Sequence, residues 1–146
     1  MNSFQHVQIL LVEDSAHDAE MTQRALKRSG IINDVTWVKD GVEALDYLFC
    51  QGAYAERDNG LPKLVLLDLK MPRMDGLQVL RRLKESELTH NIPVVILTSS
   101  REEGDLLSSY SLGVNSYIVK PVDFEQFAQT VGQVGMYWVL ANQAPE

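Results

Sequence analysis

Four short apolar runs in this chain each end on a charged or hydroxyl residue, and this pattern constrains the fold more than any other feature. The runs cover residues 7–12, 64–67, 94–97 and 117–119, and they are followed by Glu13 and Asp14, by Asp68, by Thr98, and by Lys120 and Pro121. Short apolar runs between chain breakers are typical of buried parallel strands. The polar residues are therefore expected at one edge of one sheet, where open α/β sheets bind their ligands.

The segments between the runs have helical periodicity, so strands and helices alternate along the chain. Helices are predicted at residues 15–30, after Asp40, after Gly76, at about 102–112 and at about 123–141, and a more polar strand is predicted at residues 34–38. In the helix after Gly76 and in the last helix, Leu77, Phe124 and the residues at core spacing behind them are expected to face inward. Residues 50–62 are predicted to form a loop. This alternation predicts a doubly wound α/β sheet.

Composition favours a single globular domain. The chain has 146 residues, 45% of them hydrophobic, and a formal net charge of −7. One domain over residues 1–146 is expected, with a core at about 6–130 and a terminal helix reaching about 141. An acidic chain binds nucleic acid poorly, because phosphates attract Lys and Arg.

The sequence has no feature of an exported or membrane-spanning protein. No apolar stretch reaches the roughly 20 residues that cross a bilayer. The first residues lack a secretory signal, and Cys50 is the only cysteine, which excludes an internal disulfide. A cytoplasmic protein without a membrane partner is expected.

Three carboxylates, those of Glu13, Asp14 and Asp68, are expected to converge at the strand ends. Two unit charges about 4 Å apart repel by roughly 4 kcal/mol at an effective dielectric near 20. Three carboxylates therefore need a cation, or they hold a proton. Lys120 alone cannot balance them, whereas a hard divalent ion such as Mg²⁺ can. The alternative is a solvated acidic rim without a ligand.

Asp68 is the candidate nucleophile of this predicted site. A carboxylate can attack phosphorus to give an aspartyl-phosphate. Thr98 could donate a hydrogen bond to one phosphoryl oxygen, and Lys120 could approach another. A lone threonine at a strand end is more often a cap, and a lone lysine is more often a solvated side chain. The combination of these residues favours phosphoryl chemistry.

Over nearly its whole length the chain resembles the receiver domain of two-component response regulators. The resemblance rests on VEDS at residues 12–15, LDLKMPRMDG at 67–76, LTS at 97–99 and KP at 120–121. It implies a CheY-like, flavodoxin-like sheet of five parallel strands in the order 2-1-3-4-5, with helices on both faces.

The same resemblance implies a role for each matching position. Asp68 would be the phosphoacceptor and a metal ligand, Asp14 would bind Mg²⁺ directly, Glu13 would act through water, and the backbone carbonyl of Lys70 would complete the protein ligands. Glu13 stands where many members carry aspartate, which should lengthen one metal contact.

The resemblance also implies a switch formed by Thr98 and Tyr117. Thr98 would move toward the phosphoryl group, and Tyr117 would turn inward behind it. Lys120 would meet the phosphoryl group as a point charge.

Residues 19–27, 40–49 and 120–124, together with the loop before the third strand, further resemble the small regulators paired with bacterial phytochromes. This implies a light-sensing histidine kinase as phosphodonor and a homodimer built on the last strand and the C-terminal helix. That helix carries extra apolar residues, at positions 136, 137, 139 and 140, outside its core stripe. The alternative is that these residues fold back on the same domain.

Three functions are compatible with this sequence. The first is a stand-alone phosphorylation switch that takes a phosphoryl group from a kinase histidine onto Asp68 and is not a classical enzyme. The second is a phosphate sink or relay intermediate. The third is an aspartate-based phosphohydrolase, which would need a second acid near Asp68, where Leu69 and Lys70 follow instead.

Overall fold

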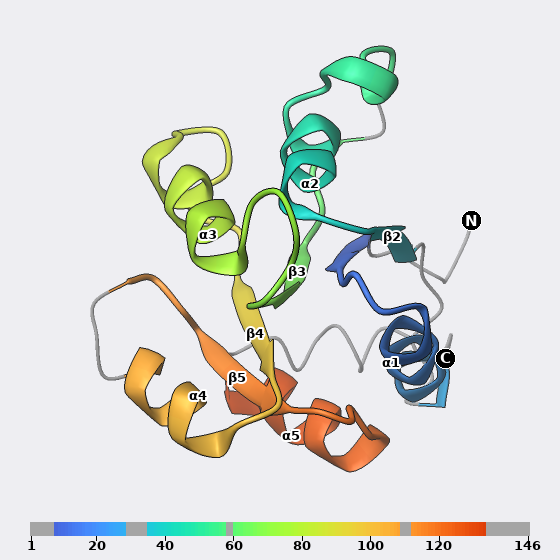
Figure 1. The fold of residues 1–146 in the computed structure, drawn as a ribbon, viewed down its shortest axis with the longest axis vertical. Helices are drawn as coiled ribbons and strands as arrows, with labels where there is room; N and C mark the ends of the chain where they lie inside the picture. Colours follow the sequence, from blue (N-terminus) through green and yellow to red (C-terminus); the bar gives the residue numbers. More distant parts are fainter. Residues whose placement is uncertain (1–7, 29–34, 58–59, 109–111, 134–146) are drawn as a thin grey trace, which may run out of the picture.

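The computed structural model describes residues 8–28, 35–57, 60–108 and 112–133 and shows strands alternating with helices (Figure 1). The strands are β1 (Ile9–Val12), β2 (Val35–Val38), β3 (Leu64–Asp68), β4 (Val94–Thr98) and β5 (Ser116–Val119). The helices are α1 (Ala16–Arg28), α2 (Gly41–Leu48), α3 (Gly76–Glu85), α4 (Arg101–Ser108) and α5 (Phe124–Gln133), with one 3-10 turn, η1 (Gly52–Tyr54).

The five strands form one parallel sheet in the order β2-β1-β3-β4-β5, as predicted. The polar strand β2 lies at an edge, which also confirms the prediction. The register pairs Val12 with Leu67, and Thr98 with Val119. Residues 13, 68, 98 and 120 therefore emerge at the same end of neighbouring strands.

Helices cover both faces of the sheet (Figure 1). Leu64 and Leu66 of β3 pack in the core with α1 and α5, whereas Val65 and Leu67 pack in the core with α2, α3 and α4. All four side chains are fully buried, which explains why the strand reads as a continuous apolar run. Burying a large apolar side chain contributes about 1.5–3 kcal/mol, so the two cores hold the strand ends in place.

Side-chain caps fix the starts of the helices. The Ser15 hydroxyl accepts the N–H of Asp18 at 3.1 Å, and Asp40 accepts the N–H of Glu43 at 2.9 Å, as the cap spacing predicts. Asp75 and Gln78 form a complete capping box at the start of α3. These caps set where each helix leaves the loops that carry the polar residues.

Two predicted core residues are partly exposed, so those predictions were wrong. Leu77 is 38% exposed, because the buried face of α3 is centred on Leu80 and Leu83 and Leu77 lies about a quarter of a turn away from that centre. Phe124 is 36% exposed because it opens α5, and the guanidinium of Arg28 lies 5.9 Å from its ring centre.

The loop predicted at residues 50–62 contains the 3-10 turn η1. The predicted end of the first helix beyond residue 28, the extension to 141 and the apolar residues at 136–140 lie outside the described residues. Among the described residues, no helix combines the length and the apolar character needed to cross a bilayer.

Candidate functional site

Six of the seven site residues predicted from the sequence line one small hollow at the carboxyl ends of the strands. The hollow has a volume of about 130 Å³, and its walls include Glu13, Asp14, Asp68, Lys70, Thr98 and Lys120. The seventh, Tyr117, lies outside this wall and packs against α4. Asp18 and Glu103 also line the hollow, although neither is predicted from the sequence to belong to it.

The three predicted metal-binding carboxylates converge. Glu13, Asp14 and Asp68 each present an oxygen, and these oxygens lie within 4.8 Å of one another. Glu13 and Asp68 are buried, whereas Asp14 is exposed at the mouth of the hollow. A set of oxygen donors that is closed on one side and open to water on the other fits a hard divalent cation that keeps part of its hydration.

Lys120 supplies the positive charge at the other side of the hollow. Its ammonium lies 3.1 Å from Asp68 Oδ1, 3.2 Å from Glu13 Oε1 and 3.1 Å from Asp18 Oδ2. Its backbone N–H donates to the carbonyl of Thr98 at 2.7 Å, which fixes the turn after β5 to the end of β4. One ammonium thus faces three carboxylates, and with Asp14 the hollow keeps an excess of negative charge.

The electrostatics of the hollow reflect this imbalance. Burial, with added repulsion from Asp68, raises the pKa of Glu13 to about 7. Burial also raises the pKa of Asp68, and the charge of Asp14 adds to this effect against the opposing influence of Lys120. Burial alone would lower the pKa of Lys120, but its bonds to Asp68 and the charge of Glu13 outweigh burial and raise it. A divalent cation would replace the protons that these carboxylates otherwise hold.

The loop after β3 is shaped by the residues of the LDLKMPRMDG motif. Gly76 packs so closely that a Cβ there would lie 2.4 Å from the backbone oxygen of Asp68, so only glycine fits. Its N–H donates to Leu69 O at 2.8 Å. Arg73, with a φ of 66°, forms a two-nitrogen bridge to the Asp40 carboxylate. The loop that carries the Lys70 carbonyl is therefore closed by the Gly76–Leu69 bond and fixed near its middle by Arg73.

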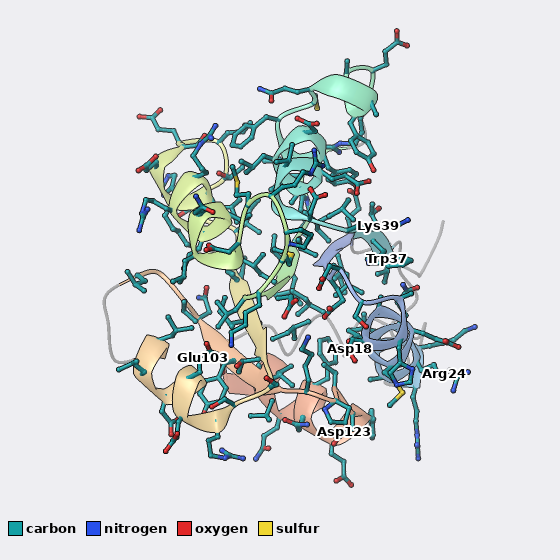
Figure 2. The ribbon with its side chains drawn as sticks, in the orientation of Figure 1. Asp18, Arg24, Trp37, Lys39, Glu103 and Asp123 are labelled. Atoms are coloured by element: carbon teal, nitrogen blue, oxygen red, sulfur yellow. The ribbon has the colours of Figure 1, made fainter. Side chains whose placement is uncertain are left out.

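Trp37 anchors the acidic loop from the edge strand. Its indole N–H donates to the backbone oxygen of Glu13 at 2.6 Å, and the ammonium of Lys39 lies 5.6 Å from the ring centre. Figure 2 shows these two side chains on β2 and the turn after it, beside the end of β1. The backbone of Glu13 is thus held from outside the hollow.

Thr98 engages a carboxylate of α4. Thr98 is almost fully buried, its hydroxyl donates to Glu103 Oε1 at 2.7 Å, and its oxygen accepts the N–H of Ser100 at 3.1 Å. The Ser100 hydroxyl accepts the N–H of Glu103 at 3.2 Å, which is a capping interaction at the start of α4. The serine and the glutamate three residues later were the sequence signal for this local geometry.

Tyr117 lies over the same turn of α4. Its hydroxyl donates to Asp105, and its ring rests on Gly104, where a Cβ would lie 2.3 Å from a ring carbon. Hydrogen bonding to Asp105 raises the pKa of the Tyr117 hydroxyl.

A larger apolar hollow of about 860 Å³ adjoins the site between the β3–α3 loop and α4. Leu77, Leu106 and Leu112 line it, and it shares Asp14, Leu69, Lys70 and Glu103 with the smaller hollow. The exposure of Leu77 is explained by its place in this wall.

Comparison with known proteins places the chain in a family. Residues 9–132 match the response regulator receiver domain. The chain is 43% identical to the probable methanogenesis regulatory protein FilR2 of Methanothrix harundinacea over 137 residues, which cover 94% of this chain and 86% of that protein.

Two solved structures are similar over nearly all of the chain. The bacteriophytochrome response regulator AtBRR is 51% identical, with a TM-score of 0.86, over 92% of this chain and 96% of that one. The Mn²⁺-bound form of response regulator Rcp1 is 38% identical, with a TM-score of 0.73, over 91% of this chain and 94% of that one; Rcp1 is a protein of Synechocystis. This chain belongs to the response regulator receiver domain family.

Proposed function

We propose that the chain is a phosphorylation switch that accepts a phosphoryl group on Asp68 with Mg²⁺ and signals by contact with other proteins. The observation that carries the proposal is the convergence of the three acidic side chains, within 4.8 Å of one another, with an ammonium 3.1 Å from Asp68. In this hollow a carboxylate, a cation site and a positive side chain meet, as transfer of a phosphoryl group requires.

The proposed reaction moves the phosphoryl group from a kinase histidine to this chain. An Asp68 carboxylate oxygen attacks the phosphorus, the phosphorus–nitrogen bond breaks, and the imidazole nitrogen keeps the electron pair. Glu13, Asp14, Asp68 and the backbone carbonyl of Lys70 would hold Mg²⁺, and the bound ion would supply positive charge to the oxygens of the transferred group. The Lys120 ammonium stabilises negative charge on another oxygen of the transferred phosphoryl group.

The switch itself is assigned to Thr98 and Tyr117. Hydrogen bonds to a charged group contribute about 1.5–3 kcal/mol each, so bonds from Thr98 and Lys120 to the phosphoryl group would together contribute about 3–6 kcal/mol. Taking an equilibrium from 1:99 to 99:1 needs roughly 5.5 kcal/mol. The two bonds approach this requirement without any change in the core.

The proposed partners follow from the relatives and the chain's charge. Similarity to AtBRR, a bacteriophytochrome response regulator, supports a phytochrome-type histidine kinase as phosphodonor in the cytoplasm. We further propose one domain over residues 1–146 and a homodimer formed through β5 and the C-terminal helix. The net charge of −7 argues against nucleic acid as a partner.

The sequence argues against a phosphohydrolase more strongly than the structure does. The residues directly after Asp68 supply no acid, but the carboxylate of Glu103 borders the same hollow. That carboxylate accepts a hydrogen bond from the Thr98 hydroxyl. A switch accumulates as a phosphoprotein, whereas a hydrolase releases phosphate continuously, so the mass of the protein separates the two.

The test is incubation with acetyl phosphate and Mg²⁺, followed by intact mass measurement. One added phosphoryl group is expected in the wild type and in Glu102→Gln, which removes an exposed acid outside the hollow. No addition is expected in Asp68→Asn or in the presence of chelator. Equal phosphorylation of Asp68→Asn would refute the assignment, as would a wild type that stays unmodified while releasing phosphate.

A further inference from the structure

The one hydroxyl proton of Thr98 already has an acceptor. It is donated to Glu103 Oε1 at 2.7 Å, the shorter of two possible contacts, since the Ser100 carbonyl lies 3.3 Å away, while the hydroxyl oxygen accepts the backbone N–H of Ser100. A threonine hydroxyl carries a single donor hydrogen. It therefore cannot donate to Glu103 and to a phosphoryl oxygen on Asp68 at the same time.

We propose that Glu103 is a positioning residue that holds the Thr98 hydroxyl in the resting state and so opposes phosphorylation of Asp68. The inference rests on the proposed function, because it assumes that Thr98 donates to a phosphoryl group there. When Thr98 turns to that group, Glu103 loses its hydrogen-bond partner, and this loss is subtracted from the stability of the phosphorylated form.

The position of Glu103 supports this role. Its side chain lines both the small hollow and the adjoining apolar hollow, so it stands at the boundary between them. Figure 2 shows Glu103 on the first turn of α4 and Asp18 on α1, on either side of the strand ends. Lys120 forms ion pairs with Asp18, Glu13 and Asp68, and its three N–H bonds are accounted for by these acids.

The residues next to Glu103 hold the second predicted switch residue. Gly104 lies under the Tyr117 ring, and Asp105 accepts the Tyr117 hydroxyl. Of three consecutive residues in α4, the first therefore contacts Thr98 and the next two contact Tyr117. Release of Thr98 from Glu103 changes the environment of the same helical turn that holds Tyr117, which gives the two residues a direct physical connection.

Charge repulsion alone is a second way in which Glu103 could oppose phosphorylation of Asp68, and it makes a different prediction. A phosphoryl group carries about −1.5 to −2 charges at neutral pH, and the Glu103 carboxylate would repel it from across the hollow. This repulsion does not need the Thr98 hydroxyl. A positioning role does need it, so a double-mutant cycle separates the two.

The experiment is titration of the protein with beryllofluoride, a mimic of the phosphoryl group, at saturating Mg²⁺ in a calorimeter. Glu103→Gln keeps the size of the side chain but replaces the charged acceptor with a weaker neutral one. We expect it to bind beryllofluoride about tenfold more tightly than wild type, equivalent to about 1.4 kcal/mol. Glu102→Gln, an exposed neighbour with the same charge change, should bind like wild type.

The cycle repeats the measurement in Thr98→Val, which removes the hydroxyl and keeps the volume. In that background Glu103→Gln should give no gain in affinity. A tenfold gain that persists there assigns the effect to charge and overturns the positioning role, as does a Glu103→Gln protein that matches Glu102→Gln. A wild type that fails to bind beryllofluoride, or an Asp68→Asn protein that binds it equally well, instead overturns the proposed function together with this inference.

Discussion

Raising the pH should destabilise the metal-free protein, and Glu13 should account for most of the effect. Burial and the neighbouring Asp68 raise the pKa of the Glu13 carboxyl from 4.5 to about 7 on folding. Between these two values the folded state binds the proton more tightly than the unfolded state does. The free energy of unfolding therefore falls as the pH rises through this window, because the carboxyl must ionise while buried.

The size of the effect follows from the shift. One pKa unit corresponds to about 1.4 kcal/mol, so between about pH 5 and about pH 8 the Glu13 contribution should change by roughly 2–3 kcal/mol. Glu13→Gln has a side chain of similar size that does not titrate. Its free energy of unfolding relative to wild type should rise by that amount over the same range.

The assay is urea unfolding, followed by far-ultraviolet circular dichroism at constant ionic strength with chelator present. Glu102→Gln is the matched control, because it makes the same charge change at an exposed position outside the hollow. Mg²⁺ should restore the stability of the wild type at about pH 8 by binding the ionised carboxylates. A constant difference between Glu13→Gln and wild type would refute the reasoning, since it would mean that burial does not hold a proton on this side chain.

Three further changes test other parts of the structure. Lys120→Ala should lower the free energy of unfolding by about 3–5 kcal/mol at neutral pH, because it leaves buried carboxylates unpaired; urea unfolding at about pH 5 should show a smaller loss, since the Glu13 carboxyl, whose pKa is raised to about 7, then holds a proton. Gly104→Ala should cost about 1–3 kcal/mol by forcing a Cβ against the Tyr117 ring, and a Tyr117→Ala background should remove most of that cost in the same assay. Arg73→Ala should cost under about 1 kcal/mol, because the bridge to Asp40 is 57% exposed on the arginine side; a larger loss in thermal unfolding would show that the bridge holds the loop itself.

The residues that directly follow strands could be placed from the sequence, whereas the residues on helices could not. Asp68 and Thr98 end buried strands, and the alternation of strands and helices puts such ends at one edge of a parallel sheet. The sheet order came from the family resemblance and agrees with the structure. That these residues lie at one edge depends only on chain direction in a parallel sheet, which the apolar pattern predicts; which strands are neighbours does not follow from that pattern.

Asp18 and Glu103 were missed because their contacts depend on how two helices pack. The sequence identified Asp18 only through its cap spacing with Ser15, but its carboxylate also reaches Lys120, 102 positions further along the chain. Glu103 was read only as part of a predicted helix. Leu77 was misplaced for a related reason: periodicity shows that a helix has an apolar side, but not where the covered part of that side is centred.

The three contacts of Lys120 limit which residue can occupy that position. An ammonium has three N–H bonds that diverge from one atom, and here three carboxylates, from the β1–α1 loop, from α1 and from β3, lie 3.1–3.2 Å from that atom. A guanidinium has the same charge, but its donors lie in one plane and point along a fork. Arginine would satisfy one or two of these acids and leave another buried without its cation, so conserving the charge at residue 120 would not conserve the site.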